Sequence, residues 1–129
     1  MATETFQLFG DTAFNSIADG FEGTTYDLKL FTNDATVTFG ISVSSLTECT
    51  DSTYVKGTLT FAVTQGSSAF LATSTDTHSF TFSASQNIYG AYITDPDNSD
   101  GLVGVAKFSA MQAVTGIDFT GGVLTLTPA

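Results

Sequence analysis

The chain has 129 residues, the usual size of one domain, and 12 of them are phenylalanine, which is enough aromatic material for a packed core. It carries 13 Asp and Glu residues against three lysines and no arginine, so its formal net charge is -10 at pH 7. Because a phosphate backbone would be repelled, this balance excludes nucleic-acid binding.

The N-terminal part predicts a strand and a short helix. Phe6 and Leu8 alternate with Thr5 and Gln7, which is the pattern of a strand. Residues 12–19 predict an amphipathic helix, with its apolar side chains at helical spacing, Asp11 as the N-cap and Gly20 as the C-terminal stop.

From residue 26 onward the hydrophobic period is two, which predicts strands. Four runs alternate apolar with polar side chains and are expected to be half-buried: 26–31, 37–43, 58–64 and 79–83. The runs 88–93 and 102–108 are apolar on both faces, as in central strands or strands covered by a partner. The runs 117–120 and 123–127 flank Gly121-Gly122, which predicts a tight hairpin.

Together these runs predict an all-β fold: an antiparallel β-sandwich, jelly-roll or Ig-like, of about eight strands with one short N-terminal helix. We expect one domain over residues 1–129, with an N-terminal strand and helix arm at 1–24 and the sandwich at 25–129. The start of the chain has no basic region followed by an apolar run, so we expect no secretory signal and synthesis in a cytoplasm. No run approaches the roughly 18 apolar residues of a membrane helix, so we expect no membrane insertion.

The densest polar cluster, Asp95 to Gly101, has three carboxylates, Asp95, Asp97 and Asp100, that invite a calcium interpretation. The register does not fit an EF-type loop that begins at Asp95, because Asp100 stands at the sixth position, where glycine is required. A hairpin loop between two apolar strands is the favoured interpretation, and we expect no bound metal.

For the candidate catalytic side chains we favour structural, non-catalytic interpretations. The single histidine, His78, is expected to be a hydrogen-bonded residue of a sandwich edge, because nothing indicates a nucleophile and a carboxylate converging on it. The single cysteine, Cys49, lies near Glu48 and Asp51, which raise the pKa of a thiol, so an unreactive thiol is expected. The sequence therefore predicts no enzyme, no cofactor and no disulfide, and it favours a protein-interaction module.

Four segments carry a resemblance: 26–34 (YDLKLFTND), 88–95 (IYGAYITD), 101–108 (GLVGVAKF) and 121–128 (GGVLTLTP). In this order they resemble strands of small β-sandwich decoration or cement proteins of tailed bacteriophages. The chain departs from them at Ala106-Lys107-Phe108, where a Glu-Arg pair is usual, so an inter-subunit ion pair at that position is not carried over from the resemblance. The resemblance implies a virion protein without catalytic residues, made in the host cytoplasm, that binds the major capsid protein on the capsid exterior as a homo-oligomer.

The alternative is a carbohydrate- or receptor-binding β-sandwich module of a tail or fibre, motivated by the acidic loop and by the tyrosines Tyr26, Tyr54, Tyr89 and Tyr92. For attachment to a capsid we expect strand edges and apolar contacts rather than salt bridges. The predicted anchor is the N-terminal segment, with the partner-binding residues Thr3, Thr5, Phe6, Gln7, Leu8 and Phe9; the same segment could instead pair within its own sheet. Repulsion between copies should weaken assembly at low ionic strength unless the capsid surface is basic.

Overall fold

The computed structural model describes residues 7–8, 24–65 and 70–126. These residues form one antiparallel sheet of six strands in the order β1-β6-β5-β2-β3, with β4 also paired to β5. The strands are β1 (Gln7–Leu8), β2 (Tyr26–Phe31), β3 (Gly57–Leu59), β4 (Ala62–Gln65), β5 (Phe70–Asp95) and β6 (Gly101–Leu126). The expected antiparallel, all-β character is confirmed, whereas an eight-strand sandwich is not what these residues form. The predicted helix at 12–19 lies outside the described residues.

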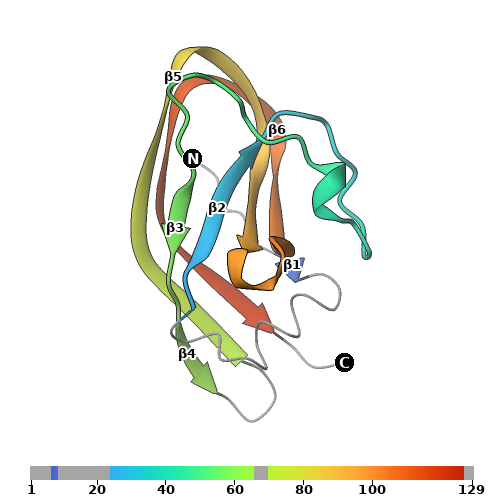
Figure 1. Ribbon diagram of the computed structural model, residues 1–129, viewed down its shortest axis with the longest axis vertical. Coiled ribbons are helices and arrows are strands. Elements are labelled where there is room, and N and C mark those ends of the chain that lie inside the picture. Colours follow the sequence, from blue (N-terminus) through green and yellow to red (C-terminus); the bar gives the residue numbers. More distant parts are fainter. Residues whose placement is uncertain (1–6, 9–23, 66–69, 127–129) are drawn as a thin grey trace.

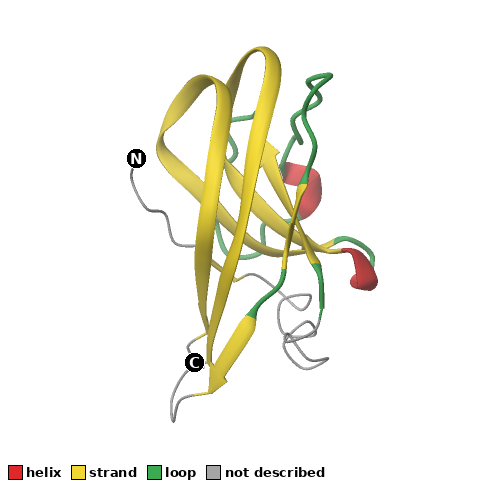
Figure 2. Cartoon of the chain, turned by 90° about the vertical axis from the view of Figure 1, so that its left-hand side faces the viewer, coloured by secondary structure: helices red, strands yellow, loops and turns green. Residues whose placement is uncertain are grey.

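The dominant element is the hairpin of β5 and β6, two strands of 26 residues each. Figure 1 shows the two strands rising together, turning over at the top and descending again, so that one ribbon supplies two facing layers. Figure 2 shows the same double layer from the side. Runs predicted as separate strands, such as 79–83 and 88–93, are therefore parts of one bent strand, which explains why fewer strands are found.

At the bend, the pairing of β5 with β6 contains two register shifts of opposite sign. Thr81 pairs with Gly116 and Gln86 with Val114, so β5 contains four residues between these pairs where β6 contains one. Further along, Ile88 pairs with Gln112 and Gly90 with Lys107, so between these pairs β6 contains four residues and β5 only one. Such irregularities bend and twist a strand pair. Because they cancel, the register on both sides of the bend is the same.

The main hydrophobic core lies between the two layers of the ribbon. Phe80 and Phe82 from the first half of β5 belong to one buried cluster with Ile88 and Ile93 from its second half and with Leu28 of β2. A second cluster lies on the other face of the inner layer, where Ala35 and Leu46 of the β2–β3 connection cover side chains of the inner strands: Phe31, Tyr92, Leu102 and Val105. The prediction that 88–93 and 102–108 are covered on both faces is confirmed.

Three local predictions are wrong. The run 58–64 is not one strand, because β3 ends at Leu59 and β4 begins at Ala62. The run 37–43 is not a strand: it forms part of the β2–β3 connection, with a turn at Phe39-Gly40 and a 3-10 helix at Val43–Ser45. Gly121-Gly122 does not form a hairpin turn but lies within β6. Gly121 does have a positive φ of 77°, yet it uses this conformation at the register shift between Ser74 and Thr77 of β5.

Candidate functional site

The charged side chains of the described residues are largely engaged with one another. Each lysine has a carboxylate partner: Lys56 Nζ lies 2.8 Å from Asp27 Oδ2, Lys107 Nζ 2.5 Å from Asp34 Oδ1 and Lys29 Nζ 3.9 Å from Glu48 Oε1. These are all the lysines of the chain, which has no arginine. The side chains therefore offer no uncommitted lysine or arginine for binding an anionic ligand.

Asp51 is the most heavily hydrogen-bonded carboxylate. Its Oδ1 accepts from the backbone N–H groups of Ser83 (2.8 Å) and Thr53 (3.0 Å), and its Oδ2 accepts from Ser83 Oγ (2.8 Å) and Gln86 Nε2 (3.2 Å). The backbone bonds from Ser83 and Thr53 hold the pKa of Asp51 far below its ordinary value. Because Ser83 lies within the bend of β5 and Gln86 directly follows it, Asp51 fastens the β2–β3 connection to that bend.

The Asp95–Asp100 segment is the loop that joins β5 to β6, as the favoured interpretation predicted. Asp95 Oδ1 accepts from the backbone N–H of Asp97 (3.0 Å), Pro96–Asn98 form a 3-10 turn, and Ser99 and Asp100 are both left-handed. Within the described ranges, no group of three or more His, Cys, Asp or Glu side chains could hold a metal ion. We therefore find a turn here and no site built around a cation.

His78 is hydrogen-bonded, as expected. Its Nε2 donates to the backbone carbonyl of Val55 (2.9 Å), and its ring packs edge-on against Phe80 with centroids 4.4 Å apart. The ring also lies directly over Gly57, where an added Cβ would come within 2.9 Å of His78 Cγ. These contacts fix the ring between β5 and the β3 edge, which is a packing role.

Cys49 is buried, and the pKa of its thiol is raised. Burial is the largest cause, and the charges of Asp51 and Glu48 add to it against a backbone hydrogen bond that lowers the pKa. The predicted direction is confirmed, although burial outweighs the two carboxylates from which it was derived.

The four tyrosines do not form a shared exposed platform. Tyr26 and Tyr92 are fully buried, and Tyr54 and Tyr89 are half-buried. Tyr54 stacks on Phe80, its hydroxyl donates to Glu48 Oε2 (2.9 Å), and the same hydroxyl accepts from a backbone N–H (3.2 Å). Burial raises the pKa of Tyr54 above its ordinary value. The tyrosines, which are one of the two observations behind the carbohydrate-binding alternative, therefore do not supply a shared binding platform.

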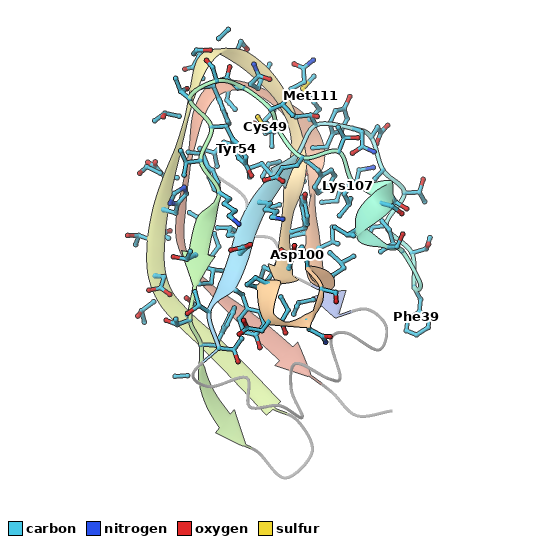
Figure 3. The ribbon with its side chains drawn as sticks, viewed as in Figure 1. Phe39, Cys49, Tyr54, Asp100, Lys107 and Met111 are labelled. Carbon is cyan, nitrogen blue, oxygen red and sulfur yellow. The ribbon has the colours of Figure 1, made fainter. Side chains whose placement is uncertain are left out.

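The most exposed large apolar side chain among those described is Phe39, which is 84% exposed. It occupies the second position of a turn in which Ile41 N donates to Thr38 O (3.1 Å). Gly40, at the third position, has φ +92°, as a type II turn requires. Figure 3 shows Phe39 at the outer tip of this connection, pointing away from the sheet.

We call residues 35–46 the Phe39 loop. Its flanks are buried: Val37 and Ile41 pack against the second core cluster, and Ala35 and Leu46 belong to it. At its base, Asn33 Nδ2 donates to Ser45 O (2.9 Å), and Asn33 Oδ1 accepts from the backbone N–H of Thr47 (2.8 Å). The tip therefore projects from a loop that is fastened at both ends.

Lys107 of β6 also holds the base of the Phe39 loop. Its ammonium group pairs with Asp34 and donates to the backbone carbonyl of Ala35 (2.7 Å). In this structure the lysine is used within the chain.

Residues 35–47 contain no charged side chain, although the chain has 13 acidic residues. Val43, within the Phe39 loop, is also exposed. Sequence reasoning missed this surface because Val37, Phe39, Ile41 and Val43 alternate as a strand would. The signal that could have found it is Gly40 in the middle of the run, which marks a turn or a bulge.

The predicted N-terminal anchor is described only in part. Gln7 and Leu8 form β1 and pair with Val105 and Gly104 of the chain's own β6. Thr3, Thr5, Phe6 and Phe9 lie outside the described residues, so the anchor stays a prediction.

In the portions of the chain that the structure describes, no helix is both long and apolar enough to cross a membrane. In comparisons with known proteins, no protein-family model, no curated protein and no solved structure matches the chain.

Proposed function

We propose that this chain is a non-enzymatic virion protein of a tailed bacteriophage, a decoration or cement protein that binds the major capsid protein on the capsid exterior. The observation that carries the proposal is the contrast between a scaffold whose lysines and several of whose carboxylates are bound internally and a neutral loop that exposes Phe39. A surface of this kind has the means for protein contact.

The assignment to a virion rests on the sequence resemblance. Three of its segments, 26–34, 88–95 and 101–108, lie side by side here, because β2 pairs with the second half of β5 and that half pairs with the first half of β6. Segments that resemble one family in sequence order and are also neighbours in space support a common scaffold more strongly than isolated strand motifs do.

We also propose that the whole chain completes a jelly-roll sandwich. The bent ribbon supports this, because it already places two layers of sheet around one core. Copies related by local symmetry on a capsid would then form the proposed homo-oligomer.

The proposal is tested on phage particles purified from the host that produces this chain. We expect the protein to co-purify with capsids and to be released by mild denaturant without loss of the shell protein. If the protein instead stays in the soluble lysate while capsids purify without it, the proposed function is wrong.

A further inference from the structure

We propose that Phe39 is the contact residue that inserts into an apolar pocket of the partner protein, so that burial of this ring, rather than an ion pair, sets the affinity. The proposal rests on the proposed function for the identity of the partner, the capsid shell protein. The contact itself is argued from the Phe39 loop.

The tip is preformed for such an insertion. The bond from Ile41 N to Thr38 O and the positive φ of Gly40 fix the turn, while Val37 and Ile41 are held in the second core cluster. With both flanks anchored, little further conformational entropy is lost when the ring is bound, apart from that of the phenylalanine side chain itself. Rigid aromatic anchors entering pockets are typical of residues that dominate binding energy.

Charge identifies the class of partner. Anionic membrane surfaces and nucleic acids attract lysine and arginine, whereas here every lysine is paired and the net charge is -10. A second copy of the chain carries the same net charge of -10, so electrostatic repulsion disfavours it as the occupant. An uncharged loop with an exposed ring fits an apolar pocket on a different protein.

The test compares Phe39→Ala with Val55→Ala. Val55 is a suitable control because it is also an exposed apolar residue, 65% exposed, but lies next to β3. Retention on particles is measured with added, labelled protein. Loss of the buried ring should weaken binding by roughly 10- to 100-fold, whereas the control should stay within about 3-fold. Neither variant should change the melting temperature by more than about 2 °C, because both side chains lack core contacts to lose.

Equal retention of Phe39→Ala and the unaltered protein would overturn the inference while leaving the proposed function intact. A second experiment covers the case in which the protein is not on capsids. A photo-crosslinking phenylalanine analogue is placed at position 39 or at position 55 in cells that make the protein. The inference requires one protein to be crosslinked from position 39 and not from position 55. An excess of the unaltered protein should suppress this crosslink, whereas the Phe39→Ala variant should not. Crosslinks only to the chain itself, or none, would refute it.

Discussion

Replacing Gly90 by alanine tests the packing of the inner layer. Gly90 lies between Phe31 of β2 and Lys107 of β6 in the sheet. A Cβ at this position would be 2.3 Å from the carbonyl oxygen of Ala106 and 2.7 Å from two ring atoms of Phe31. Contacts below 3.0 Å are essentially never made by a Cβ, so the β6 backbone would have to move by about 0.7 Å, the difference between 3.0 and 2.3 Å.

Two effects of the Gly90→Ala change oppose each other. Alanine restricts the unfolded chain and thereby stabilises the fold by up to about 1 kcal/mol. Overpacking costs about 1–3 kcal/mol, and the upper end applies here because the closest atom is backbone in a paired strand and Phe31 is fully buried. We therefore expect a net loss of about 2 kcal/mol in the free energy of unfolding.

The loss of stability is measured as a melting temperature. An unfolding entropy of about 2.1 cal/mol/K per residue over 129 residues is about 0.27 kcal/mol/K, so 2 kcal/mol corresponds to about 7 °C. The control is Gly40→Ala, where a Cβ meets no atom within 4 Å and only the positive φ is strained, at a cost of about 1 kcal/mol. A Gly90→Ala protein that melts within 2 °C of the original would refute the packing argument.

Three further changes test the polar contacts. Asp51 has a lowered pKa, so its stabilising effect is present above its unfolded pKa of about 3.8 and is lost as the pH falls toward the folded value. Asp51→Asn should therefore lower the melting temperature at pH 7 and flatten the acid side of the plot of melting temperature against pH. Tyr54→Phe leaves the backbone N–H of Leu30 without this acceptor and should cost about 1–2 kcal/mol in urea unfolding, while Tyr89→Phe, at another half-buried tyrosine, serves as a comparison. The Cys49 thiol should react with a thiol reagent roughly 100-fold more slowly in the native protein than in denaturant, and equal rates would show that it is accessible.

The inner sheet was largely predictable because its signal is local. Tyr26, Leu28 and Leu30 alternate along one strand and all point into the main core. The apolar runs at 88–93 and 102–108 predicted burial on both faces, and two core clusters provide it. The hydrophobic period of a strand and the number of its apolar faces depend on a few neighbouring residues. Both can therefore be predicted without knowing which strands pair with each other.

The continuity of the ribbon was not predictable from the same pattern. The bend of β5 falls among residues 82–85, where the alternation breaks as it would at a loop. At this bend the Asp51 carboxylate, which lies 32 residues before Ser83, accepts hydrogen bonds from the Ser83 N–H and hydroxyl. The sequence around Ser83 does not indicate a contact with a residue so far away. In the sequence, this bend is therefore indistinguishable from the end of one strand and the start of another.

The proposed contact at Phe39 lies outside the segments on which the proposed resemblance to decoration proteins rests. The resembling segments 26–34, 88–95 and 101–108 supply the inner layer, where apolar residues on both faces are required for packing. The Phe39 loop lies between two of these segments in sequence and outside the sheet in space, fastened by Lys107 at the position where the resemblance fails. Packing constrains the strands, whereas an exposed tip is free to match a particular pocket. Under the function proposed above, proteins with similar strands need not share a binding partner, and we expect the residue that sets the partner of this chain to be Phe39 rather than a residue of the sheet.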